Sequence, residues 1–497
     1  MAEPSGNRTI AANISRNDAS GESVTGTLSF SDQRPANTIT LSGVFPSDSI
    51  DLEAFFTGVN EIENYPLLHL QTAEGFFTAI DSRVIRSTQN LGGSKLSEKV
   101  LLPRFLIRGS VLLREHELGV TDATVRFWDQ DEWAQWSSWK VKNATEEDPD
   151  VTIVQMARPT VTAIVNGATI SLKDQSPRAY FPIGNGEVTM RQSCVFRLTF
   201  DSEIPLKDFM RDWLRPLAFL ISSGSRQTSG IDSLSIHNRG WLSDRDGQLL
   251  VDTWLEVIAS NPERRPPQQG DGYLHRLRDF DFERQLQTVF DTFQAHGAAI
   301  DQYLDFIHNR PSTPMVRLTL LAQLVETFDR SLNVDAPLTR EVECSAKEVE
   351  KLLKTREQLR SYASTAERAV RESIRPTLSH RLSRLDRQTG KLVSDALGSG
   401  KWKSDVPAVR NAVIHGLPSA KFLTTNVIPL QVAEEILNLL CEARMLLALG
   451  FETDGVKKVL IENDSGWWGR RSDIVTYLDT FAEFAAYGRG TSGGPDA

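Results

Sequence analysis

The stretch VTAIVNGATISL, from Val161 to Leu172, carries the sharpest local signal in the chain. Two runs of alternating apolar and polar residues flank the pair Asn166-Gly167. This dipeptide is a preferred two-residue turn between antiparallel strands, because both of its positions tolerate positive φ angles. The stretch therefore predicts a β-hairpin, and it indicates antiparallel sheet in this part of the chain.

The period of two extends in both directions from this hairpin. From about Val24 to Asn238, runs rich in Val, Ile, Thr and Phe alternate with polar breaks. One segment, residues 205–224 (PLKDFMRDWLRPLAFLISSG), instead spaces its apolar residues as a helix does. The sequence predicts a disordered N-terminus over residues 1–23, followed by an antiparallel β-rich domain over residues 24–258.

The period changes to 3.6 after residues 259–272, ASNPERRPPQQGDG, whose prolines, glycines and polar side chains favour a linker. Beyond it, apolar residues recur at helical spacing, and one long helix is expected from Ala346 to Ile374. The predicted fold class is α+β, with the β-rich domain followed by an all-α bundle. The remaining expected boundaries are a linker with connecting helices over residues 259–312, the helical domain over 313–487 and a disordered tail over 488–497.

The composition is that of an ordinary globular protein. Hydrophobic residues make up 40% and charged residues 24% of the 497 residues. No window offers about 18 consecutive apolar residues, and the polar start lacks the apolar core of a signal peptide. The cysteines Cys194, Cys344 and Cys441 are far apart, which fits neither a disulfide framework nor a metal knuckle. We therefore expect a cytoplasmic protein without a membrane span.

The net charge of −10 is unevenly distributed. Residues 1–312 hold 30 basic and 41 acidic residues, so their partner is expected to be a protein or a small ligand rather than nucleic acid. Residues 351–403 hold 13 basic and 5 acidic residues, an excess that could attract a polyanion. A solvated, Arg-rich helix face explains the same excess, and both interpretations stay open.

Two other patterns suggest chemistry at first sight. The segment VRFWDQDEWAQWSSW, with Asp129 among its tryptophans, could offer indoles for base stacking. No basic residues are interleaved, so packing of the indoles into the β-rich domain is favoured. The eight histidines show no HExxH or His/Cys metal spacing, and GxSxG is absent. We expect neither a metal nor another cofactor.

The segment VPAVRNAVIHGLP, residues 406–418, places Arg410, Asn411 and His415 at one helix end. Ser404 or Asp405 is expected to cap a helix that runs from about Val406 to His415, with Pro407 in its first turn. The following glycine and proline end it. A histidine in the last turn is a common partner of the helix dipole, which is the purely structural interpretation.

The run RNAVIHG resembles the RxxxxH motif of the HEPN superfamily, whose members are small helical bundles and include many metal-independent ribonucleases. Asn411 after the arginine and Gly416 after the histidine both fit that pattern. The helix RLTLLAQLVETFDRSL, which contains Glu326, resembles the first helix of the family. The resemblance implies that Arg410, Asn411 and His415 are catalytic, with Glu326 in a supporting position.

The first part of the chain resembles the N-terminal domain of the ApeA family, bacterial antiphage defence proteins that join such a domain to a HEPN domain. The likeness is carried by GTLSF, LIRGSVL, FWDQDEW and the segment at residues 205–224. It implies an abortive-infection effector that cleaves cellular RNA, with tRNA as one candidate, when a phage-derived trigger is present. The sequence does not identify that trigger.

The expected chemistry needs only protein groups, because the 2′-hydroxyl of RNA is itself the nucleophile. His415 can move a proton near neutral pH, and the guanidinium of Arg410 can stabilise charge on the phosphate. On a straight helix the two side chains lie roughly 140° apart. We therefore expect a homodimer that forms one composite site. The alternative is a catalytically inert HEPN-like module for dimerisation or nucleotide binding.

Overall fold

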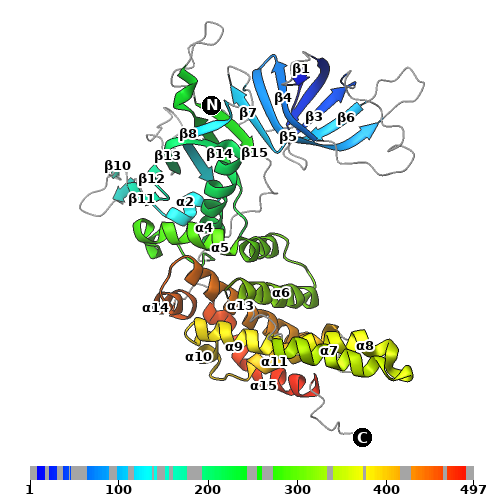
Figure 1. Cartoon of the computed structure of the whole chain (residues 1–497). Coiled ribbons are helices and arrows are strands. Elements are labelled where there is room, and N and C mark those ends of the chain that lie inside the picture. Colours follow the sequence, from blue (N-terminus) through cyan, green and yellow to red (C-terminus); the bar gives the residue numbers. More distant parts are fainter. Residues whose placement is uncertain are drawn as a thin grey trace. The chain divides into compact units, whose positions relative to one another are not determined.

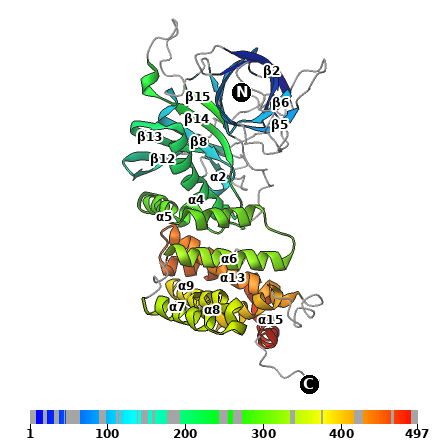
Figure 2. The ribbon, with the colours of Figure 1, turned by 45° about the vertical axis from the view of Figure 1, so that its right-hand side comes forward.

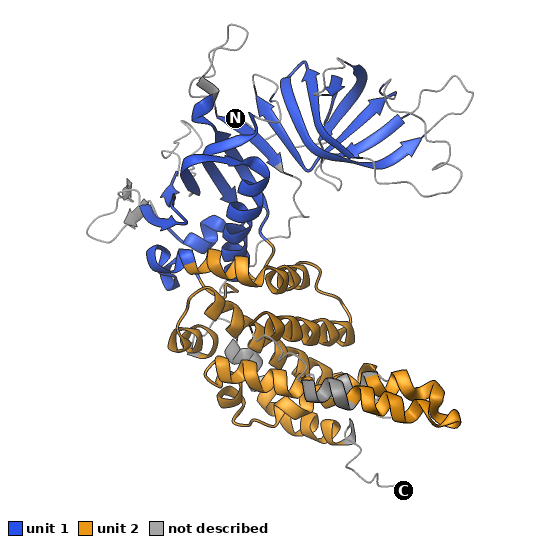
Figure 3. Ribbon diagram, viewed as in Figure 1, with its two compact units in different colours: residues 1–225, 229–268, 276–287 blue, residues 226–228, 269–275, 288–497 orange. Residues whose placement is uncertain are grey.

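The computed structural model divides into two compact units (Figure 3). Unit 1 comprises residues 1–225, 229–268 and 276–287, and unit 2 comprises residues 226–228, 269–275 and 288–497. The structure describes residues 8–16, 22–30, 37–43, 45, 64–88, 98–109, 113, 117–136, 139–142, 152–155, 160–175, 193–242, 254–259, 272–332, 340–372, 376–414, 427–462 and 467–488.

Unit 1 is built on one antiparallel sheet of 13 strands, in the order β11-β12-β13-β8-β14-β15-β7-β5-β4-β1-β2-β3-β6. β9 (Trp139–Lys142) and β10 (Thr152–Gln155) form a separate pair. The strands of the large sheet are β1 (Arg8–Arg16), β2 (Ser23–Phe30), β3 (Asn37–Ser42), β4 (Asn64–Thr72), β5 (Gly75–Thr88), β6 (Glu98–Leu102), β7 (Phe105–Gly109), β8 (Gly119–Phe127), β11 (Thr160–Val165), β12 (Ala168–Asp174), β13 (Cys194–Pro205), β14 (Ile231–His237) and β15 (Leu255–Ala259).

Part of this sheet closes into a barrel. β5 pairs with β6 as well as with β4, so the strands β5, β4, β1, β2, β3 and β6 form a ring (Figure 2). Its interior is filled with side chains, among which Ile14, Leu28, Ile39 and Leu68 are completely buried. A closed barrel of this kind has no exposed strand edge.

The N-terminal prediction was wrong in part. Residues 8–16, expected to be disordered, form β1, which pairs with β2 and β4 in the barrel. The reason lies in the alternation of Ile10, Ala12 and Ile14, whose side chains are buried while the residues between them face outward. Three small or β-branched residues suffice here, because the barrel supplies a partner on both sides of the strand.

The remaining strands continue from β5 as an open sheet (Figure 1). β5 is 14 residues long and also pairs with β7, so it takes part in both the barrel and the open sheet. β15 lies between β14 and β7: Ile236 of β14 faces Leu255, and Val257 faces Ile107 of β7.

The predicted hairpin is confirmed. β11 and β12 pair in the register Val165 opposite Ala168, which leaves a two-residue turn. Asn166 and Gly167 have φ angles of 47° and 83°. The predicted inserted helix is also confirmed, as a continuous run of α3 (Leu206–Asp208), a π-helical turn (Phe209–Leu214) and α4 (Arg215–Ser225).

Unit 2 is helical, so the predicted order of an antiparallel β-rich part followed by a helical part is confirmed. Its helices begin with most of α5 (Phe282–His308), whose first residues belong to unit 1, and its other described helices are α6 (Pro314–Leu332), α7 (Arg340–Lys354), α8 (Ala363–Glu372), α9 (Leu378–Gln388), α10 (Leu392–Leu397), α11 (Trp402–Ile414), α13 (Ile428–Ala448), α14 (Thr453–Lys457) and α15 (Trp467–Gly488).

α13 is the central helix of this bundle and packs against α6 and α15. Most of its residues are buried, as expected for a helix that is apolar nearly all round. The buried Glu434 on it accepts hydrogen bonds from Nε of Arg317 at 2.6 Å and from Arg310 at 2.9 Å. In the described part of the chain, no helix combines the length and apolar character needed to cross a membrane.

The single long helix expected from Ala346 to Ile374 was wrong. The chain leaves the helix after Lys354, takes an extended conformation at Arg356, and returns as α8, which packs against α7. Ala346 of α7 and Ala363 of α8 are both buried. No glycine or proline marks the break in the sequence. Residues 260–271 of the expected linker, and 489–497 of the expected tail, lie outside the described residues.

Candidate active site

α11 carries the predicted motif but starts earlier than expected. It begins at Trp402, so Ser404 and Asp405 lie inside the helix and do not cap it, and Pro407 is an interior residue rather than part of the first turn. The proline removes one backbone donor at the sixth position of the helix. The early start is explained by Trp402, whose buried indole Nε1 donates a hydrogen bond to Oγ of Ser394 at 3.2 Å.

A buried carboxylate anchors this start of α11. Asp386 of α9 is completely buried and accepts hydrogen bonds from Oγ of Ser394 at 2.6 Å and from Nζ of Lys403 at 2.7 Å. The backbone N–H of Ser394 also points to it at 3.3 Å. α9, α10 and α11 are therefore tied together at one charged group, which fixes where α11 begins.

A second buried carboxylate ties α9 to α6. Asp329 of α6 is completely buried, and Nη1 of Arg381 donates to it at 2.6 Å. Arg384, one turn further along α9, donates to the same carboxylate through Nε at 3.0 Å and through its Nη2 group. α9 in turn packs against α11, so this ion cluster supports the helix that carries the motif.

These contacts change the meaning of the basic segment over residues 351–403. Arg381 and Arg384 neutralise a buried aspartate that lies outside the segment, and Lys403 pairs with Asp386 inside it. Charges used in this way are not available to a polyanion. The described basic residues of the segment that remain exposed are Lys351, Lys354, Arg356, Arg360, Arg387, Lys391 and Lys401, of which Lys354 pairs with Glu350. The local excess of positive charge is thus in part structural.

Arg410 lies at the edge of the buried face of α11, one turn after the completely buried Val406, and is half-buried. Val409 and Ala412 are also completely buried, whereas Asn411 points away from this face and is exposed. Nη1 of Arg410 donates to Oδ1 of Asn411 at 3.4 Å, a long contact. Nε of Arg410 is buried and has no hydrogen-bond partner among the described residues.

His415 lies outside the described residues, together with the predicted helix end at Gly416 and Pro418. The structure therefore brings together two of the three predicted catalytic residues and leaves the position of the third untested.

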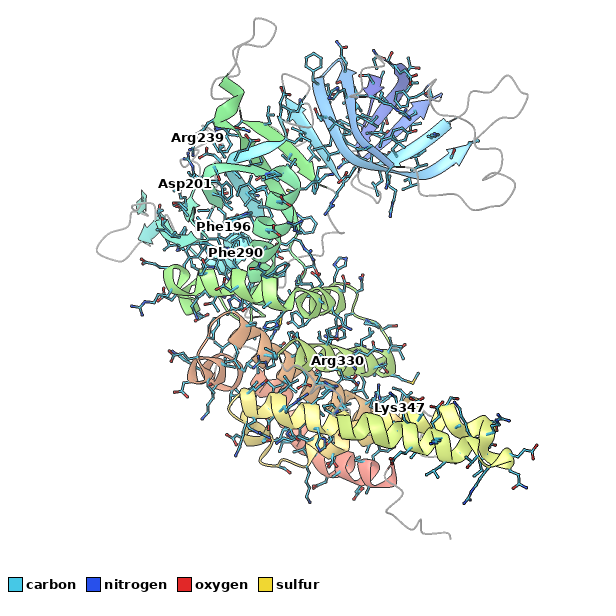
Figure 4. All side chains as sticks on the ribbon, viewed as in Figure 1. Phe196, Asp201, Arg239, Phe290, Arg330 and Lys347 are labelled. Carbon is cyan, nitrogen blue, oxygen red and sulfur yellow. The ribbon has the colours of Figure 1, made fainter. Side chains whose placement is uncertain are left out.

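Glu326, predicted to support the site, points to another residue. It is half-buried on α6 and forms an ion pair with Arg330 at 3.5 Å, one turn further along the helix; Arg330 is labelled in Figure 4. In the described part of the chain it forms no ion pair with Arg410. The acidic groups that do support α11 are Asp329 and Asp386, which the sequence analysis missed. The only available signal was an aspartate within an amphipathic helix.

The tryptophan-rich segment of unit 1 packs into the protein, as favoured over base stacking. Trp133 is completely buried and its ring lies 6.5 Å from that of Phe280. Asp131 of this segment accepts a hydrogen bond from the backbone N–H of Cys194, the first residue of β13, at 2.7 Å. Burial raises the pKa of the Asp131 carboxyl and of the Cys194 thiol, which keeps this thiol protonated. The side chain of Trp139 lies outside the described residues.

Metal-binding chemistry has no cluster to build on in the described part of the chain, where no three His, Cys, Asp or Glu side chains gather as ligands would. The exposed group that could act on a ligand here is the guanidinium of Arg410, beside the amide of Asn411. A guanidinium and an amide together can bind phosphate oxygens.

Comparison with known families finds one match. Residues 13–236 match the family described as ApeA N-terminal domain 1, which covers the barrel and most of the open sheet but less than half of the chain. No curated protein and no solved structure matches. Residues 13–236 are therefore similar to ApeA N-terminal domain 1, a family associated with antiphage defence, and this part of the chain is an ApeA-like N-terminal domain.

Proposed function

We propose that the protein is an antiphage effector whose helical unit cleaves RNA without a metal, using Arg410, Asn411 and His415. The observation that carries the proposal is the pair of the half-buried Arg410 and the exposed Asn411 on α11, in a helical unit that follows an ApeA-like domain. Only the HEPN resemblance of RNAVIHG assigns His415 to the same site.

The orphaned Nε of Arg410 supports this role. A buried guanidinium nitrogen without an acceptor among the described residues is costly, and a phosphate oxygen would satisfy it once the side chain turns to expose that nitrogen. With Nη1 engaged only by the long contact to Asn411, the guanidinium can bind a phosphate through two nitrogens. Asn411 then holds the plane of the guanidinium and offers its own amide to the same phosphate.

The reaction uses the nucleophile in the substrate. The 2′-hydroxyl of RNA attacks the adjacent phosphorus, and the bond from phosphorus to the 5′-oxygen of the next nucleotide breaks. His415 takes or delivers a proton, and Arg410 stabilises the charge that builds on the phosphate oxygens. The products are a 2′,3′-cyclic phosphate and a 5′-hydroxyl. Five residues along a straight helix would set the side chains of Arg410 and His415 roughly 140° apart, so we propose that two protomers supply one site.

The test compares wild type with Arg410→Ala and His415→Ala, and with Arg387→Ala as a matched control. Arg387 is an exposed arginine on α9 in the same unit, with no role in the proposed site. Loss of a proton-transfer group or of a charge-stabilising group should lower the cleavage rate by about 10²-fold or more. Arg387→Ala should cleave like wild type. Cleavage is measured on total RNA, and phage protection in cells.

The inert-module alternative gives a different result. If Arg410→Ala and His415→Ala fold, self-associate and protect against phage like wild type, the helical unit is a scaffold and the nuclease proposal is wrong. Loss of cleavage in EDTA would contradict the metal-free mechanism. The mass in solution, measured over a range of concentrations, tests the dimer: activity that stays proportional to concentration in a monomeric chain would contradict a composite site.

A further inference from the structure

β11 forms one edge of the 13-stranded sheet. It pairs with β12 on one side, and no described residue pairs with its other side. Its sequence, TVTAIV, contains no charge and no proline, the devices by which proteins usually protect an open edge. Ile164 on this strand is 73% exposed. An unprotected edge with an exposed isoleucine can pair with a further strand.

The hairpin register identifies which backbone groups face outward. Val165 and Ala168 close a two-residue turn, so they exchange hydrogen bonds with each other. Antiparallel pairing then alternates, and the backbone groups of Val161 and Ala163 also face β12. Those of Thr160, Thr162 and Ile164 face away from it. Three N–H and three C=O groups are thus presented along about 14 Å of open edge, from Thr160 to Ile164.

A pocket of about 890 Å³ adjoins this edge within unit 1. Residues 160–162 of β11 form one wall. Three aromatic side chains, Trp136, Phe280 and Phe282, line it as well. The pocket is of mixed character, because Gln135, Arg278 and Glu283 also line it and Phe280 and Phe282 are largely buried in its floor. A pocket beside a row of outward-facing backbone groups is the arrangement by which strand addition gains both affinity and side-chain selectivity.

The charged groups at the pocket determine which charge on a ligand is favoured. Asp281 and Glu283 line it and face solvent. Two cations lie near them: Arg278 is 3.8 Å from Asp279, and Arg284 forms an ion pair with Asp281 at 3.6 Å. Glu283 forms no ion pair with another described residue, so its charge is available to a ligand. A ligand with a basic side chain is therefore favoured over an acidic one.

We propose that an extended segment of a partner protein adds to β11 as a further strand, placing one side chain against Trp136 in the pocket and a Lys or Arg beside Glu283. The segment hydrogen-bonds to the outward groups of Thr160, Thr162 and Ile164. This surface is separate from α11, and the proposal holds whether or not the helical unit cleaves RNA.

The experiment selects binders for the full chain from a yeast-displayed library of random peptides, each about twelve residues long, twice the length of β11. The peptides that bind wild type are then measured by fluorescence anisotropy against three variants. Thr162→Pro removes an outward N–H but none of the hydrogen bonds to β12. Thr162→Val is its matched control, because it keeps that N–H. Glu283→Lys reverses one charge at the pocket without altering the edge.

The selected peptides should alternate apolar residues with polar ones and contain at least one Lys or Arg. Thr162→Pro should weaken their binding about tenfold, Thr162→Val should bind like wild type, and Glu283→Lys should weaken basic peptides about tenfold. Melting curves of the variants exclude unfolding as the cause.

Three outcomes overturn the proposal. Selected peptides could bind Thr162→Pro as tightly as wild type, or none could be enriched above a surface coated with Thr162→Pro. In the third outcome, no peptide is enriched, and wild type self-associates whereas Thr162→Pro does not. A second copy of the chain, rather than a partner protein, would then cover β11.

Discussion

Replacing Asp329 with asparagine is the sharpest test of how the helical unit is held together. The carboxylate is completely buried and accepts from Arg381, itself 3% exposed on its side chain, and from Arg384, which is 30% exposed. The asparagine side chain would have nearly the same shape but no charge, so a buried cation would lose its counter-charge. Removing one partner of a buried ion pair costs about 3–5 kcal/mol.

Arg384 can move toward solvent, so the cost arises mainly at Arg381 and the lower half of that range is expected. A loss of about 3–4 kcal/mol corresponds to a fall of about 10 °C in the melting temperature for a unit of this size. Urea unfolding followed by circular dichroism measures it. Asp479→Asn, on the exposed side of α15, is the matched control and should stay within about 0.5 kcal/mol of wild type.

The double variant Asp329→Leu with Arg381→Met separates charge from packing. It removes the buried cation together with its partner, and apolar replacements of buried ion pairs are often neutral. Most of the lost stability should therefore return. The reasoning fails if Asp329→Asn unfolds within about 1 kcal/mol of wild type, or if the double variant is as unstable as the single one.

Three further predictions concern single positions. Gly167→Val should destabilise unit 1 by about 1–2 kcal/mol in urea unfolding, because valine disfavours a φ of 83° while its Cβ would meet no atom within 4 Å; an unchanged midpoint would contradict the strained turn. Complete burial lowers the pKa of His275 to about 3, so the unfolded chain takes up a proton below pH 6.5 when the folded chain does not. Stability should therefore fall by about 2 kcal/mol from pH 7 to pH 5 through this group, and His275→Phe should lack that part of the slope; equal slopes would contradict it. Burial raises the pKa of the Cys194 and Cys441 thiols, so iodoacetamide should modify them only in urea, as read by mass spectrometry; rapid labelling of the native protein would show that they are accessible.

Local signals in the sequence predicted local structure well. The Asn166-Gly167 turn and the helix over residues 205–224 each depend on neighbours in the chain, and both are present. The alternation of Ile10, Ala12 and Ile14 was equally visible in principle. It lies in a polar, asparagine-rich stretch, so only the closure of the barrel gives those three residues enough buried surface to form a strand.

Long-range features could not be predicted in the same way. The break after Lys354 has no glycine or proline, and it is recognised only from the packing of α8 against α7. The excess of positive charge over residues 351–403 was compatible with a binding surface or with a solvated helix face. Two of the arginines in it, Arg381 and Arg384, instead pair with Asp329, which is distant in sequence. Of the candidate site, Arg410 and Asn411 were placed correctly on a helix, while the start of that helix was set by Trp402 and Asp386.

The place of β15 bears on how this protein can be cut into fragments. The match to the ApeA-like domain ends at residue 236, yet β15, at residues 255–259, is the strand through which β14 and β7 are joined. A fragment that stops at residue 236 would lack β15, so its sheet would be divided in two. The edges of β14 and β7 would then be unpaired, and unpaired edges promote aggregation. The boundary recognised by family comparison and the boundary of the smallest expressible piece are therefore different, and the second lies beyond Ala259.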